Sequence, residues 1–228
     1  RALRPDPRIT DLSVRLPRPY INEDWPQAGG HPTHAMHHLT LDEAPSQAWR
    51  VSAGVGAGDL LRLTAVPIVA DQRVYVLDSE GNVAAHRADN GLRLWRYNIV
   101  PESEDRGALG GGLAYDRGIL YLATGYGEAI ALLAENGAEV WRRSIGVPLR
   151  GAPTVVNGRF FTVSYDNQLY ALNIEDGSVD WSHIGIAEDA GIIGAASPAV
   201  EGDVVVAPYS SGELVALRVE NGRILWAD

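Results

Sequence analysis

The histidines near the N-terminus are the first side chains in this sequence that could do chemistry. His31, His34, His37 and His38 fall within eight residues. Imidazole is a common ligand of transition metals, so such a cluster could bind one. No carboxylate or thiolate flanks the four histidines to complete a set of ligands. We therefore predict a solvated or capping segment here, and no metal site.

Two glycine runs and one acidic loop could bind phosphate or calcium. Neither residues 54–58 nor residues 110–112 continue into the Lys-Ser/Thr pair of a P-loop, and neither begins a helical pattern. We interpret both runs as the starts of inner β-strands. Glu102, Glu104 and Asp105 do not have the spacing of an EF-hand loop, and we expect a solvated loop there.

The sequence offers no catalytic constellation. His86 and His183 each stand alone in the repeats, and we expect a surface or edge role for both. No Ser/His/Asp set can be assembled from the pattern. The chain has no cysteine, which excludes disulfides, thiolate metal sites and a cysteine nucleophile. We predict neither an enzyme nor a bound cofactor.

Charge and hydropathy narrow the classes of partner. The 228 residues carry a formal net charge of −10, and every basic residue is arginine. An acidic chain without a basic stripe argues against binding to nucleic acid or to an anionic membrane surface. The sequence contains no run of 18 apolar residues, which is about the length a helix needs to span a bilayer. The chain begins at Arg1 without a signal peptide, so we expect a processed or trimmed product.

A fourfold repeat organises the chain and must position any functional loop. Each unit has Ala, then Gly six residues later, then Trp four residues after that, with an acidic residue and Asn or Asp just before the Gly. The tryptophans are 46, 40 and 45 residues apart. The four sets are Ala85, Gly91 and Trp95; Ala131, Gly137 and Trp141; Ala171, Gly177 and Trp181; and Ala216, Gly222 and Trp226.

Each unit has the pattern of a four-stranded meander. An acid-Asn-Gly or acid-Asp-Gly turn between apolar runs indicates a hairpin, because Asn and Gly tolerate positive φ. A second turn position lies fourteen residues before each Trp, at Gly81, Gly127, Asn167 and Gly212. Four strands in each unit of about 40–45 residues are typical of a β-propeller blade. We expect the Trp to wedge between neighbouring blades, and the Ala to fill a position with room for little more than a methyl group.

The repeats also predict how much of a ring is present. We expect an extended N-terminal segment at 1–40 and a partial propeller at 41–228, with repeats at about 65–98, 111–144, 152–184 and 197–228. Trp49 lies 46 residues before Trp95 and supplies a fifth outer strand without three inner strands. A closed four-bladed ring has no place for that strand. The chain is therefore predicted to be an open half-ring of four blades from a ring of eight.

The repeats closely resemble the PQQ-type propeller repeat, which quinoprotein dehydrogenases share with several non-enzymatic propellers. A more specific resemblance is to the N-terminal half of the BamB family of outer-membrane β-barrel assembly lipoproteins, in the style of alphaproteobacterial members. It rests on Trp25-Pro26-Gln27-Ala28-Gly29-Gly30, His34, Leu39, Ala48-Trp49, Gly54-Val55-Gly56 and Val66-Pro67.

The BamB resemblance implies a non-catalytic periplasmic scaffold that docks on the POTRA domains of BamA, with the membrane reached only through a lipid anchor upstream of this chain. The family's docking loop precedes the fourth repeat, which corresponds by position to residues 189–194, with Ile192, Ile193 and Gly194 as the candidate contacts. The family's Leu-Arg-Gly sequence occurs one blade earlier, so Leu149 and Arg150 are second candidates.

Two alternatives remain open. The chain could instead be part of a PQQ-dependent quinoprotein dehydrogenase or of a propeller that senses a small molecule. That branch of the repeat family uses quinone-contacting residues, Ca²⁺ ligands and often a vicinal disulfide, which a chain without cysteine cannot form. The two isoleucines could also begin the inner strand of the fourth unit and belong to its core.

Overall fold

A computed structural model of the chain describes residues 13, 15–59, 61–187 and 196–228. Within those residues the sequence forms sixteen strands in four separate sheets, and each sheet is an antiparallel meander of four consecutive strands. This confirms the prediction of four four-stranded blades. No helix in the described part of the chain is long and apolar enough to cross a bilayer.

The blades follow one another along the chain. Blade one contains β1 (Ile68–Ala70), β2 (Arg73–Leu77), β3 (Asn82–Arg87) and β4 (Arg93–Asn98). Blade two contains β5 (Gly111–Asp116), β6 (Ile119–Thr124), β7 (Glu128–Leu133) and β8 (Glu139–Ser144). Blade three contains β9 (Thr154–Val156), β10 (Arg159–Val163), β11 (Gln168–Asn173) and β12 (Val179–Ile184). Blade four contains β13 (Ala199–Glu201), β14 (Val204–Pro208), β15 (Leu214–Arg218) and β16 (Ile224–Ala227).

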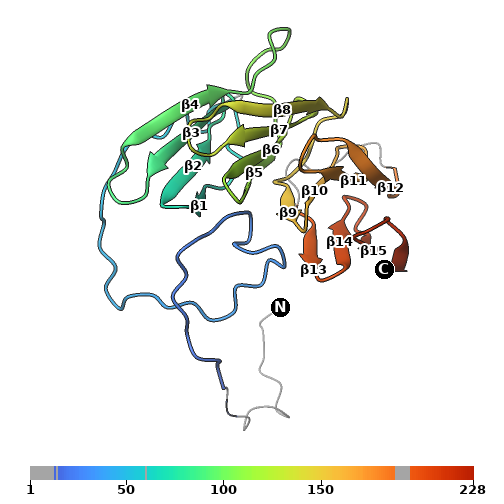
Figure 1. Ribbon diagram of the computed structural model, residues 1–228, viewed down its shortest axis with the longest axis horizontal. Coiled ribbons are helices and arrows are strands. Elements are labelled where there is room, and N and C mark those ends of the chain that lie inside the picture. Colours follow the sequence, from blue (N-terminus) through green and yellow to red (C-terminus); the bar gives the residue numbers. More distant parts are fainter. Residues whose placement is uncertain (1–12, 14, 60, 188–195) are drawn as a thin grey trace.

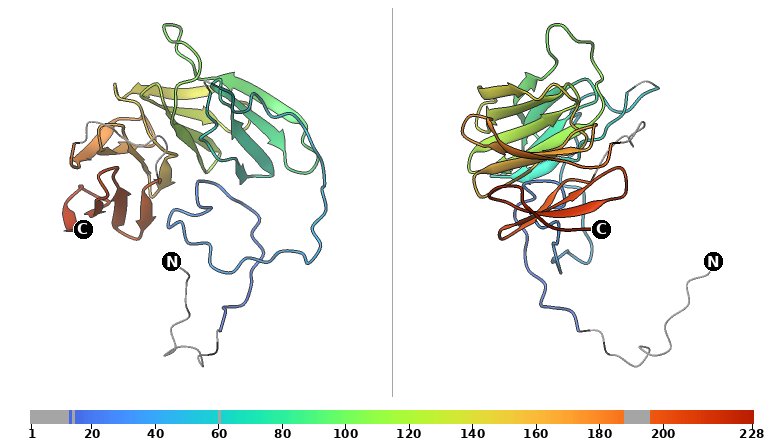
Figure 2. Two further views of the ribbon diagram at one scale, coloured as in Figure 1. Left: turned by 180° about the vertical axis from the view of Figure 1, so that it is seen from behind. Right: turned by 90° about the vertical axis from the view of Figure 1, so that its right-hand side faces the viewer.

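The four blades stand side by side in an open arc (Figures 1 and 2). The first strand of each blade lies on the inner side of the arc, and consecutive first strands contact one another, β1 with β5, β5 with β9, and β9 with β13. The buried apolar side chains form three clusters, between blades one and two, two and three, and three and four. The core of the protein therefore lies between blades, and each blade depends on its neighbours for burial.

Both predicted turns occur in every blade. Gly91, Gly137, Gly177 and Gly222 have φ between 69° and 75°, in the hairpin that precedes the outer strand. The second turn position has positive φ in all four blades, and Asn167 takes it at 57° without being glycine. Each repeat Ala is completely buried and lies opposite the repeat Trp of its own blade, as Ala85 lies opposite Trp95.

The repeat tryptophans of blades one, two and three wedge against the following blade, as predicted. The Trp95 indole N–H donates to the Ala134 carbonyl at 2.9 Å, and a Cβ on Gly137 would lie 2.7 Å from the ring. Trp141 and Trp181 bond in the same way to the carbonyls of Ile174 and Val219, at 2.8 and 3.0 Å. The glycine in each hairpin therefore makes room for the ring of the preceding blade. The spacing that recurs within each repeat thus produces a contact between two repeats.

Trp49 and Trp226 occupy the two ends of this series. Trp49 donates to the Ala88 carbonyl at 2.9 Å and packs on Gly91 of blade one. The residues around it form no ladder with another described strand, which fits an outer strand without three inner ones. Trp226, on the outer strand of blade four, is 49% exposed.

Residues 20–40 form what we call the N-terminal loop, on the concave side of the arc (blue in Figure 1). Its two ends are joined by a parallel bridge between Tyr20 and Leu39. The sequence indicated only an extended segment, and it gave no sign that this loop contacts the blades.

Candidate protein-docking face

The connections that leave the outer strands gather at one end of the blades. We call this end the loop face. It contains the turn between the second and third strands of each blade and the described parts of the inter-blade connections, which are residues 99–110, 145–153, 185–187 and 196–198. Backbone hydrogen bonds tie the two kinds of loop together, from Ile99 to Gly81, from Ile145 to Gly127 and from Gly185 to Asn167, at 2.9, 2.7 and 2.8 Å.

Asp78, in the blade-one turn, organises the first part of this face. Its carboxylate accepts the backbone N–H groups of Glu80 and Asn82 within the turn, and that of Val55 from the segment before the blade. A Cβ on Gly54 would lie 2.6 Å from the carboxylate. The glycine run 54–58 therefore lies against this turn. Our prediction that it begins an inner strand is wrong. The same prediction for the run 110–112 is confirmed, because β5 starts at Gly111.

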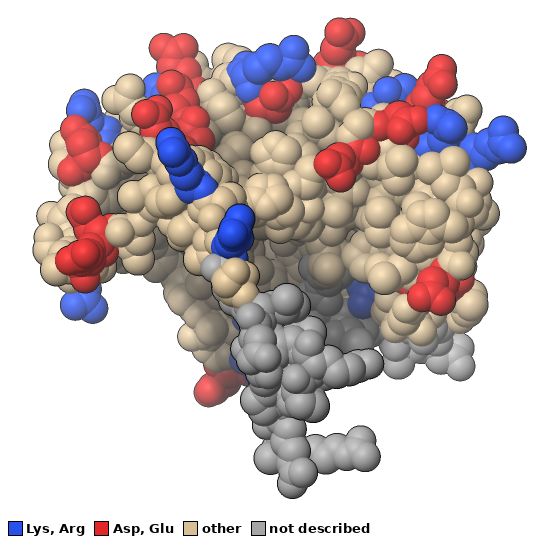
Figure 3. Space-filling model, turned by 90° about the horizontal axis from the view of Figure 1, so that it is seen from below, with Lys and Arg blue, Asp and Glu red and all other residues tan. Residues whose placement is uncertain are grey.

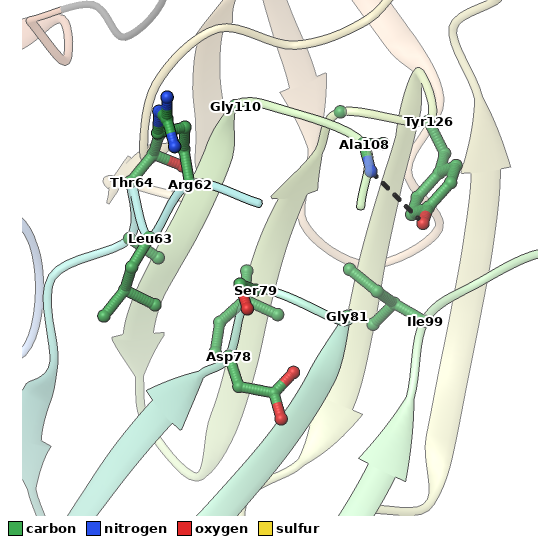
Figure 4. Close-up of a pocket in the computed structure, with 13 residues that line it drawn as sticks. Arg62, Leu63, Thr64, Asp78, Ser79, Gly81, Ile99, Ala108, Gly110 and Tyr126 are labelled. Carbon is green, nitrogen blue, oxygen red and sulfur yellow. Dashed lines mark hydrogen bonds between the residues drawn. The ribbon is translucent and has the colours of Figure 1, made fainter. Parts of the chain in front are cut away.

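A small cleft opens between the turn of blade one and the loop that leads to blade two (Figure 4). Leu63, Asp78, Ser79 and Tyr126 line it. The Tyr126 hydroxyl donates to the Asp105 carbonyl at 2.9 Å, and it accepts the Ala108 N–H at 3.4 Å. These bonds hold the C-terminal end of the acidic loop, while its Glu102 and Glu104 side chains are exposed to solvent. The cleft has room for about one water molecule, at about 20 Å³, and is not a substrate site.

Leu149 and Arg150, the second-choice docking residues, are both inside the structure. Leu149 is fully buried in the cluster between blades two and three. Arg150 is 2% exposed, donates to the Asn167 side-chain oxygen at 3.0 Å, and lies 5.6 Å from the centre of the Tyr165 ring. Their side chains hold two blades together. Their Leu-Arg-Gly pattern carried no information on burial.

Asn167 connects three segments of the loop face. Its side-chain oxygen accepts from Arg150 and from the hydroxyl and N–H of Ser210 in the turn of blade four, at 3.0, 2.8 and 3.1 Å. Its amide nitrogen donates to the Ile186 carbonyl at 2.8 Å. Asn167 is 1% exposed. Asparagine suits this position because it tolerates positive φ and both donates and accepts.

The preferred docking residues, Ile192, Ile193 and Gly194, lie outside the described residues. The sequence pattern did not indicate Ile186, which lies shortly before that stretch. Its side chain is 59% exposed, while its backbone is held from both sides, by Asn167 and by a 2.8 Å hydrogen bond from its N–H to the Glu213 carboxylate. An exposed Ile on a fixed backbone is a suitable apolar anchor for a protein partner. No periodic signal marks it, because it lies outside the repeat.

The isolated histidines have structural partners. His86 is 3% exposed and bonds through Nδ1 to the Gly91 carbonyl at 2.9 Å, so the predicted surface or edge role is wrong. It replaces the buried Leu of the other repeats because its ring closes the hairpin. His183 stacks on Tyr209, with Nδ1 2.8 Å from the hydroxyl. Burial lowers the pKa of His183, although Glu213 opposes this, and burial raises the pKa of Tyr209.

The N-terminal histidines do not converge. Across residues 13, 15–59, 61–187 and 196–228, no three His, Asp or Glu side chains are placed to share a metal ion. His31 bonds to Thr33, and His38 to the Pro17 carbonyl at 2.7 Å. Burial, with His31 nearby, lowers the pKa of His34. On the side of the molecule that Figure 3 shows, acidic and basic side chains are interspersed, without a large field of one sign.

Comparison with known proteins shows which protein family has this architecture. The sequence profile of a family described as outer membrane protein assembly factor BamB matches residues 37–109 and 99–228. The BamB protein of Shewanella oneidensis is 30% identical over 146 residues, which cover 59% of this chain and 35% of that one. The chain spans half the length, or less, of the curated relatives it matches.

Solved structures share the fold. The crystal structure of BamB from Moraxella catarrhalis superposes with a TM-score of 0.63 at 21% identity, over 73% of this chain and 49% of that one. A europium-containing methanol dehydrogenase superposes with a TM-score of 0.72 at 18% identity, over 90% and 48%. At these identities the likeness concerns the propeller fold alone. The repeats, the blades they form and the profile that spans them together show that this chain belongs to the BamB family of outer membrane protein assembly factors.

Proposed function

We propose that this protein is a non-catalytic periplasmic scaffold of the outer-membrane β-barrel assembly machinery. Membership of the BamB family carries the proposal. In this proposal, the propeller lies at the outer membrane and binds the POTRA domains of BamA through its inter-blade loops. The repeat residues support a scaffold, since each of them has a turn or packing role.

The loop face supports this location for the contact. Rigid scaffolds position binding loops, and a few well-packed side chains carry most of the binding energy of a protein interface. Ile186 provides such a side chain immediately before the loop that the resemblance selects at 189–194. We therefore place the docking centre at Ile186, Ile192 and Ile193. Leu149 and Arg150 support it from inside, because Arg150 bonds to Asn167, which holds Ile186.

The test is co-purification of the complete protein with the periplasmic domains of BamA from the same organism. Ile186→Asp, and the double change Ile192→Asp with Ile193→Asp, should each weaken binding at least tenfold. The matched control is Val179→Asp, which places the same charge on a comparably exposed residue of blade three, at the far end of β12. Unchanged binding by both folded loop variants would eliminate this docking site.

A quinoprotein dehydrogenase has only the fold likeness in its favour. Titration of the complete protein with pyrroloquinoline quinone and Ca²⁺, followed by a dye-reduction assay, separates the two functions. A scaffold gives no turnover in this assay. Quinone-dependent turnover would end the scaffold proposal.

A further inference from the structure

The N-terminal loop contacts the innermost strand of every blade. The backbone of Trp25 pairs with Val69 on β1 in both directions, at 2.6 and 2.9 Å. The Pro26 carbonyl accepts the N–H of Tyr115 on β5 at 2.7 Å, and the Pro32 carbonyl accepts the N–H of Val200 on β13 at 2.8 Å. Eight residues of one loop thus satisfy inner-edge groups of blades one, two and four.

Gln27 makes the contact with blade three. Its side-chain oxygen accepts the N–H of Val155 on β9 at 3.0 Å, and its side-chain nitrogen lies 3.5 Å from the Val155 carbonyl. The backbone of the same residue bridges to Ala114 on β5. The carboxamide therefore pairs with an edge strand as a peptide group would. Gln27 is 2% exposed, so these bonds are shielded from water.

The loop is built to keep this shape. Tyr20 and Leu39 join its ends, and the Tyr20 hydroxyl donates to the Met36 carbonyl at 2.9 Å. Gly30 is buried, and a Cβ there would lie 2.7 Å from the Met36 sulfur and 2.9 Å from the Trp25 ring. The joined ends and the internal packing are the features that make a loop compact. The connector that follows is different, because residues 41–46 are exposed.

We propose that the inner edges of the four blades form a single peptide-binding groove along the propeller axis, and that residues 25–32 are its ligand, bound in cis. Unpaired strand edges are templates for added backbone, and an extended segment binds them through main-chain hydrogen bonds. Proline supplies a carbonyl without a competing N–H at positions 26 and 32, and Gln27 reaches the strand that the backbone does not. By crossing from β1 to β13, the bound segment fixes the angles between blades.

The experiment cuts the connector after folding. A specific protease site replaces residues 41–46 of the full chain, and the folded protein is cleaved and passed over a gel-filtration column. We expect the N-terminal fragment to remain bound and to exchange with a labelled peptide of residues 20–40, but not with a scrambled one. Backbone amide exchange at Val69, Tyr115, Val155 and Val200 should stay slow until the fragment leaves.

Gln27→Leu keeps the size of the side chain and removes both of its hydrogen bonds to Val155. We expect the cleaved variant to release the fragment at least tenfold faster, with faster exchange at Val155. Glu23→Gln, at an exposed position of the same loop, should release it at the unchanged rate. If Gln27→Leu does not fold, the proposal is tested by the exchange of the labelled peptide into the cleaved unmodified protein. Immediate loss of the unmodified fragment, with no change in exchange at the four amides, would overturn the proposal.

Discussion

Gly137→Ala tests whether the repeat glycines are required by the tryptophan of the preceding blade. Gly137 has φ of +75°, and an added Cβ would lie 2.7 Å from Trp95, between blades one and two. An L-residue in this conformation costs about 1–2 kcal/mol. Overpacking a well-filled core costs about 1–3 kcal/mol more. Alanine also makes the unfolded chain less flexible than glycine does, and this offsets up to about 1 kcal/mol of the lost stability. We expect a net loss of about 2–4 kcal/mol.

The assay is urea unfolding followed by far-UV circular dichroism, supported by thermal melts. For a domain of this size the loss corresponds to a decrease in Tm of about 5–15 °C. Gly118→Ala is the matched control in the same blade. Gly118 has φ of +86°, but an added Cβ would meet nothing within 4 Å. It should therefore lose only the backbone part of about 1–2 kcal/mol, reduced by the same unfolded-chain contribution of up to about 1 kcal/mol. Equal losses in the two variants, within about 0.5 kcal/mol, would refute the steric role of Trp95.

Trp141→Phe should lower the free energy of unfolding by about 1–3 kcal/mol, because it leaves a partly buried carbonyl of the next blade without its donor. The same change at the half-exposed Trp226 should cost less than about 0.5 kcal/mol, and equal losses in urea unfolding would contradict the inter-blade role of the indole N–H. Burial lowers the pKa of His183 below its ordinary 6.5, so the unfolded chain binds the proton more readily and stability should fall as the pH drops through 6.5. Urea midpoints between about pH 5 and 8 should fall less steeply in His183→Gln, and an unchanged profile would assign the pH dependence to other groups such as His34.

The blades were predictable because their determinants are local and repeated. An Asn-Gly or Asp-Gly pair specifies a hairpin whatever surrounds it, and four copies at similar spacing specify four similar units. The repeat also indicated that tryptophan and alanine are buried, since large rings and small side chains recurred at fixed positions. Ile186 could not be found in this way, because it belongs to a loop of irregular length between repeats.

The sequence by itself therefore determined the type of blade, the number of blades and the position of each turn, because each depends on residues close together in the chain. The tertiary structure alone decided which side chains outside the repeat are exposed and which lie in the core. It placed Leu149 and Arg150 inside, and His86 against its own hairpin. It also brought Gln27 to Val155, 128 residues away, because an edge strand can be completed by any chain segment with the right donors and acceptors, and no periodic signal records that pairing.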